Sequence, residues 1–124
     1  MNDKEKSAGE FIRLLQIMDE LRDKCPWDKK QTNDTLRKLT IEETYELADA
    51  IISGDDDAIR GELGDLMLHI VFYAKMGEEK GSFNITDVLN GICQKLIYRH
   101  PHIFGDTKVN SDKDVIVNWE KLKA

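Results

Sequence analysis

Four carboxylates in the first half of the chain are spaced so that they could hold a metal ion together. Glu43 and Glu46 lie three residues apart, and so do Glu62 and Asp65. Residues three apart on a helix project from the same face, so each pair predicts two carboxylates that point the same way. Hard oxygen ligands of this kind suit Mg²⁺ or Mn²⁺. A metal of this type indicates a phosphate-bearing substrate.

The segment around the first pair, TLRKLTIEETYELADAII (residues 35–52), has the apolar spacing of a helix. A seven-residue step from Leu36 and Leu39 reaches Glu43 and Glu46. The two carboxylates therefore occupy positions that would otherwise face the core. Carboxylates that face one another away from water either take up protons or bind a cation. This segment predicts half of a metal site.

The second pair is expected to face the first across a helical hairpin. Glu46 lies eight residues before Gly54 and Glu62 lies eight residues after it, so the pairs should stand at the same height. No Glu is followed by His at the third position, which argues against a carboxylate di-iron site. His69 shares the face of this second pair and is interpreted as a core residue or a partner of a ligand in preference to a ligand itself. Gly64, in the middle of a helix, is expected to allow close approach of a neighbouring helix or else of the substrate.

Helical periodicity covers most of the chain, and no stretch alternates as a strand would. Asn33 is expected to cap the second helix, with Gly54 ending it. We predict an all-α fold of one domain over residues 1–124, a helical bundle of four main helices plus a short C-terminal helix. The segments that follow Lys24 and His100 are expected to be loops. The expected helices cover about residues 7–24, 33–53, 55–80, 85–100 and 111–123.

The composition excludes several classes of protein. The 124 residues are 40% hydrophobic and 34% charged, with a formal net charge of −6, which argues against a nucleic-acid-binding surface. No apolar run reaches the length of a membrane span, and the polar N-terminus does not resemble a signal peptide. Cys25 and Cys93 do not have zinc-ligand spacing. We expect a cytoplasmic protein with reduced cysteines.

The order of several motifs resembles one known family. EETYE followed by ELGD is similar to the EExxE…ExxD signature of the MazG family of nucleoside triphosphate pyrophosphohydrolases. CPWDKKQT, KLIYRHPHIFGD and VNWEKLK also match that family in order and spacing, so the resemblance covers roughly residues 10–123. It implies an all-α fold that dimerises. It also implies Mg²⁺-dependent hydrolysis of (d)NTPs between the α and β phosphates, in a nucleotide-pool housecleaning role, with Mn²⁺ as a substitute metal.

The resemblance also implies roles for individual residues. By matching positions, the metal ligands are Glu43, Glu46, Glu62 and Asp65. Glu42 would contact a second metal or the attacking water, and a Glu of this EETYE segment would take the proton of that water. The candidate catalytic residues are thus Glu42, Glu43 and Glu46.

Cations and aromatic side chains are the candidates for binding the nucleotide. Lys95 and Arg99 lie four residues apart on one helical face and would bind the phosphates, or else are solvated surface cations. Trp27 would either stack on a base or plug the end of the bundle. Gln31 is a candidate phosphate or base contact.

Two further expectations follow from the resemblance. Many family members carry a second related domain, so the chain is either a single-domain member or the N-terminal part of a longer protein. The alternative to an enzyme is a catalytically weak module that binds nucleotide and dimerises. In both cases we expect a homodimer, because hairpins with one polar face need a partner to bury the rest of their apolar surface.

Overall fold

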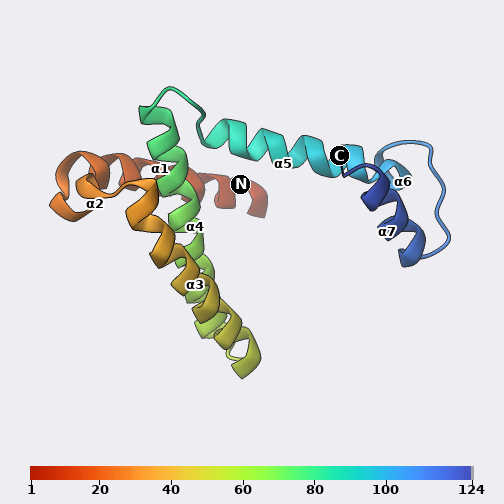
Figure 1. The fold of residues 1–124 in the computed structure, drawn as a ribbon, viewed down its shortest axis with the longest axis horizontal. Coiled ribbons are helices and arrows are strands. Elements are labelled where there is room, and N and C mark those ends of the chain that lie inside the picture. Colours follow the sequence, from red (N-terminus) through yellow and green to blue (C-terminus); the bar gives the residue numbers. More distant parts are fainter. Residues whose placement is uncertain (124) are drawn as a thin grey trace. The chain divides into compact units, whose positions relative to one another are not determined.

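The computed structural model describes residues 1–123, in which helices form all of the regular secondary structure. The all-α prediction is confirmed. Seven helices are present in this range where five were expected, because two segments predicted as loops each form a short helix that begins at a proline. In chain order the helices are α1 (Asp3–Lys24), α2 (Pro26–Lys30), α3 (Asn33–Ser53), α4 (Asp56–Glu79), α5 (Ile85–Arg99), α6 (Pro101–Phe104) and α7 (Asp112–Lys121) (Figure 1).

Side-chain caps determine where the first two long helices begin. Helix α1 starts four residues earlier than predicted, because Asn2 forms a capping box with Glu5. The N-cap of α3 is Thr32 and not Asn33, because Thr32 exchanges capping hydrogen bonds with Thr35. Polar residues that follow one another can each cap a helix, so spacing alone did not distinguish them.

Helices α3 and α4 form the predicted hairpin and lie side by side (Figure 1). Gly54 ends α3 with a left-handed φ of 71°, a conformation that glycine adopts without a Cβ clash. Asp55 then caps α4 by accepting from the backbone N–H groups of Asp57 and Ala58. The tight turn fixes which residues of the two helices stand opposite one another.

The described chain comprises two compact units, residues 1–84 and residues 85–123. In the first, α1 packs on α2 and α4, and α3 packs on α4. Its core is built around four fully buried side chains: Met18, Leu36, Val71 and Phe72. In the second unit α5 packs on α6.

One arginine joins three elements of the first unit. Arg22 of α1 donates from Nη1 to the carbonyl oxygens of Asp28 (2.6 Å), Lys29 (3.2 Å) and Gln31 (3.0 Å). Its Nε and Nη2 donate to the carboxylate of Glu79 in α4, each with a contact of 2.9 Å. The arginine therefore fixes the short helix α2 against α1 and α4.

Part of the apolar stripe of α4 is exposed in this chain. Leu63, Met67 and Ile70 are 50%, 41% and 40% exposed. The helices that pack on α4 are α1 and α3, and they cover only part of the stripe. Across residues 1–123, no helix combines the length and apolarity needed to cross a bilayer.

Candidate metal centre

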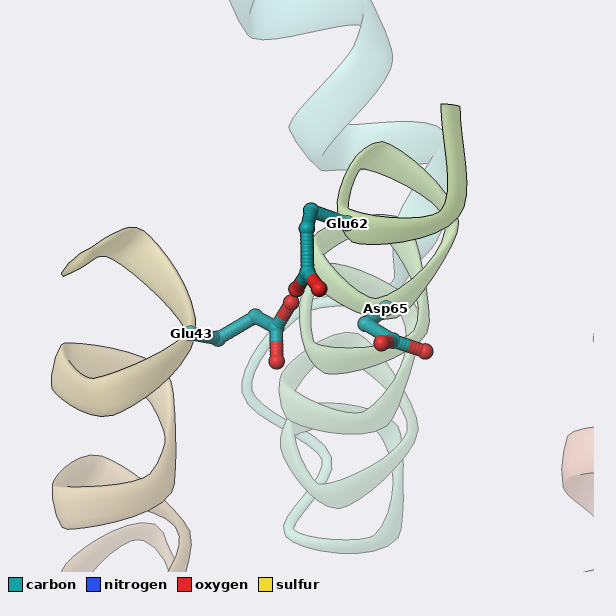
Figure 2. A group of neighbouring side chains, drawn as sticks. All are labelled: Glu43, Glu62 and Asp65. Carbon is teal, nitrogen blue, oxygen red and sulfur yellow. The ribbon is translucent and has the colours of Figure 1, made fainter. Parts of the chain in front are cut away.

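Three of the four carboxylates that the sequence analysis singles out come together from the two hairpin helices. Glu43 projects from α3 toward Glu62 and Asp65 of α4 (Figure 2). One carboxylate oxygen from each residue lies within 4.8 Å of the others. The three-residue step between Glu62 and Asp65 places both acids on the face of α4 that meets α3.

Glu43 is the most buried of the three acids, with 9% of its surface exposed. Burial raises the pKa of its carboxyl to about 8, and the hydrogen bond and negative charge of Glu62 add to this effect. Asp65 and Glu46 raise the same pKa further through their charges. In the absence of a cation, Glu43 is thus predominantly protonated at neutral pH.

Two buried oxygens of this group have no hydrogen-bond partner. They are Oε1 of Glu43 and Oε2 of Glu62. An unpaired buried oxygen is costly, and a cation between the carboxylates would satisfy both. The group consists of oxygen donors alone, which fits a hard divalent cation. The residues present could therefore hold a metal ion.

Glu46 and Glu42 lie outside this group and are exposed. The buried and half-buried positions around Glu43 on α3 are Thr40, Leu47 and Ala50. Glu46 lies beside this stripe. Its charge still acts on Glu43. Its predicted role as a ligand, like the predicted catalytic role of Glu42, stays a prediction.

Gln31 and Trp27, two of the predicted nucleotide contacts, lie next to and within the short helix α2. Gln31 is buried, donates from Nε2 to the carbonyl of Trp27 (3.0 Å) and accepts from the Thr35 hydroxyl (2.8 Å). Trp27 is 53% exposed, so it does not plug the bundle. It is the second residue of α2, directly after Pro26.

The two predicted phosphate-binding cations lie in the second unit, on α5. Lys95 is exposed. Arg99 stacks over the ring of Trp119 at 5.0 Å and donates from Nη2 to the carbonyl of Lys123 (3.2 Å). Binding of Arg99 to a phosphate would require its guanidinium to share or leave these contacts.

Gly64 and His69, both on α4, differ from their expected roles or are specified further by the structure. A Cβ added at Gly64 would meet no atom of another helix within 4 Å, so this glycine does not serve close packing within the described chain. His69 is not part of the carboxylate group; its Nδ1 lies 2.8 Å from the hydroxyl of Thr40. Thr40 was not identified from the sequence, although it stands three residues before Glu43 on the same helix.

Comparison with known proteins identifies the family. The family model described as the MazG nucleotide pyrophosphohydrolase domain matches residues 31–104, which include all three grouped acids. The chain belongs to the MazG family. Among curated MazG-type relatives, it is 49% identical over 119 residues to a nucleoside triphosphate pyrophosphohydrolase of Escherichia coli (strain K12). It is 46% identical over 122 residues to the nucleoside triphosphate pyrophosphohydrolase/pyrophosphatase MazG of Thermotoga maritima.

These MazG relatives are longer than the chain. The alignments cover 94% and 96% of this chain but 45% and 46% of the two relatives, so the chain spans about half their length. The crystal structure of a mazG-related protein from Thermotoga maritima superposes with a TM-score of 0.76 at 26% identity. That match covers 90% of this chain and 96% of the other, so a solved MazG-related chain has this fold over almost its whole length.

Proposed function

We propose that the chain hydrolyses nucleoside triphosphates between the α and β phosphates and releases a nucleoside monophosphate and pyrophosphate. The observation that carries the proposal is the group of Glu43, Glu62 and Asp65, with two unpartnered buried oxygens, in a chain of the MazG family. Relatives that carry the name nucleoside triphosphate pyrophosphohydrolase support the substrate class. A housecleaning role in the nucleotide pool follows from this activity.

The three carboxylates would hold Mg²⁺, with Mn²⁺ as a substitute. When bound, the ion supplies positive charge for the phosphates and lowers the pKa of a bound water. The chain itself contributes a fixed array of oxygens on two rigid helices. Glu46 and Glu42 lie on the exposed side of α3, where they are available to a second ion or to the attacking water. Lys95 and Arg99 remain the candidate phosphate-binding cations.

A homodimer is the proposed assembly. Apolar side chains along the hairpin are open in the single chain: Ile41, Tyr45, Ile51, Ile52 and Leu63 are between 47% and 84% exposed. Apolar surface of this extent marks an interaction site. A second copy that packs on the hairpin would bury these side chains and bring the apolar stripe of α4 into a core.

One assay separates cleavage between the α and β phosphates from other outcomes. The chain is incubated with each NTP and dNTP in Mg²⁺, and the products are resolved by anion exchange. Monophosphate with pyrophosphate is expected. Diphosphate with inorganic phosphate would place the cleavage at the γ phosphate and contradict the proposal.

The matched variants are Glu62→Gln and Asp65→Asn, with Asp49→Asn as the control. Asp49 is an exposed acid on α3 outside the grouped carboxylates, so its variant should keep parental turnover. The two site variants should lose activity and retain the helical circular dichroism signal. Full turnover by both would remove the carboxylate group from the mechanism.

The alternative function is a nucleotide-binding and dimerisation module with weak turnover. It is favoured by the engagement of Arg99 with the ring of Trp119 and with the carbonyl of Lys123. Under this alternative, Mn²⁺ and nucleotide bind to the chain, and no monophosphate is released from any NTP even at high protein concentration.

A further inference from the structure

One hydroxyl links the two hairpin helices next to the carboxylate group. Oγ1 of Thr40 on α3 lies 2.8 Å from Nδ1 of His69 and 2.6 Å from the hydroxyl of Tyr73, both on α4. It also lies 3.2 Å from the carbonyl oxygen of Leu36, one turn earlier on its own helix. All three contacts are partly buried.

The direction of these hydrogen bonds follows from the donor inventory. A threonine hydroxyl has one proton to donate and two lone pairs to accept with. The Leu36 carbonyl can only accept, so it must receive the Thr40 proton. Tyr73 O–H and His69 Nδ1–H then donate to Thr40. This assignment satisfies all three contacts at once and gives neutral His69 the Nδ1–H tautomer.

The hydrogen-bonded group of Thr40, His69 and Tyr73, called the junction below, lies close to the metal ligands along both helices. Thr40 precedes Glu43 by three residues, about 4.5 Å along the helix axis and on the same face. His69 follows Asp65 by four residues and also shares its face. Rotation or sliding of α3 against α4 would therefore break the junction and separate Glu43 from its two partners together.

We propose that Thr40 is a positioning residue for the carboxylate site, accepting hydrogen bonds from both His69 and Tyr73. Its hydroxyl fixes the rotation of α3 so that Glu43 faces Glu62 and Asp65. The mutual repulsion of the three carboxylates opposes this arrangement when they are ionised. The junction holds the site together against that repulsion, and this inference rests on the proposed binding of a divalent cation there.

Mn²⁺ affinity, measured by calorimetry with the full chain, tests the proposal. Thr40→Val keeps the shape of the side chain and removes the hydroxyl. It should weaken Mn²⁺ binding about tenfold, the lower end of the loss for direct partners of a metal ligand, because Thr40 acts on Glu43 through the helix. Thr40→Ser, which keeps the hydroxyl, should restore parental affinity. If Thr40→Val does not fold, Tyr73→Phe removes one of the two donors and should weaken binding by a smaller factor.

A matched control separates positioning from general destabilisation. Ala50→Gly weakens α3 at a buried position two turns beyond Glu43 and should lower the melting temperature without changing Mn²⁺ affinity at temperatures where the variant is folded. Equal losses of affinity in Ala50→Gly and Thr40→Val, or no loss in Thr40→Val, would overturn the proposal. A parent chain that does not bind Mn²⁺ would instead overturn the proposed metal site and the positioning role together.

The tautomer gives a second readout that does not depend on the metal. In ¹⁵N-labelled protein at a pH where histidine is neutral, the His69 signals, assigned by their absence in His69→Gln, should show a protonated Nδ1. In Thr40→Val the proton should move toward Nε2. A parent chain with its proton on Nε2 would contradict the assignment.

Discussion

Replacement of Glu43 by glutamine should make the metal-free protein more stable at alkaline pH. Burial and neighbouring carboxylates raise the pKa of Glu43 from 4.5 to about 8. The folded protein therefore keeps a proton that the unfolded chain releases above pH 4.5. Because the folded state binds more protons in this interval, its stability falls as pH rises from about 4.5 to about 8 and is then constant.

The size of this effect follows from the same two values. The interval from 4.5 to about 8, at about 1.4 kcal/mol per unit, sets an upper value of about 5 kcal/mol. Asp65 is exposed, so water reaches one side of the group and screens part of the charge. We expect Glu43→Gln to gain about 2–4 kcal/mol over the parent between pH 5 and pH 9, because part of the interval lies below pH 5. The gain arises because the amide stays neutral.

Urea unfolding followed by circular dichroism, in EDTA at several pH values, measures this difference. Asp49→Asn removes an exposed carboxylate from the same helix and should stay within about 0.5 kcal/mol of the parent throughout. Parallel pH profiles for the parent and Glu43→Gln would refute the reasoning. With Mn²⁺ at a hundredfold excess over its dissociation constant, the parent should gain about 2.7 kcal/mol at pH 8 and the glutamine variant much less.

The packing of the first unit supports further tests by thermal and urea unfolding. Arg22→Met should lower the unfolding free energy by about 2–3 kcal/mol, because it removes charged hydrogen bonds to Glu79 and to three carbonyls. A loss below about 0.5 kcal/mol would contradict the role of Arg22 in linking the three helices. Gly77→Ala should leave the stability near that of the parent, within about 0.5 kcal/mol, because the new Cβ would come 2.8 Å from the Phe83 ring and displacement of that ring offsets the gain in helix propensity. Gly64→Ala, which meets no atom of another helix within 4 Å, should instead stabilise the chain by about 0.5–1 kcal/mol; equal effects of the two alanines would refute this contrast.

The helices and the carboxylate group could be predicted because both depend on local spacing. Apolar periodicity and the glycine at residue 54 defined the hairpin, and the hairpin register placed Glu43 opposite Glu62 and Asp65. The prediction was less accurate for the rotation of individual side chains. Glu46 occupies a core-spaced position in the pattern but lies on the exposed side of the group.

Features that depend on contacts between distant residues could not be predicted from spacing. Thr40 and Tyr73 are 33 residues apart, and their hydrogen bond requires a specific rotation of both helices. Arg22 and Glu79 are separated by 57 residues. A lone threonine or arginine in a helix is usually solvated, so neither residue stood out before the helices were placed.

The contacts of Arg22 have a consequence for local unfolding. Helix α2 has five residues, too few to be stable alone, and its last carbonyls receive their hydrogen bonds from the side chains of Arg22 and Gln31. The helix therefore exists only while α1 and α4 hold that arginine in place. Proteolysis and amide exchange should begin at residues 26–30, well before the hairpin opens. Exchange in the segment CPWDKKQT therefore measures whether α1 and α4 are packed together. The hairpin that carries the carboxylates can stay folded after α2 has unfolded.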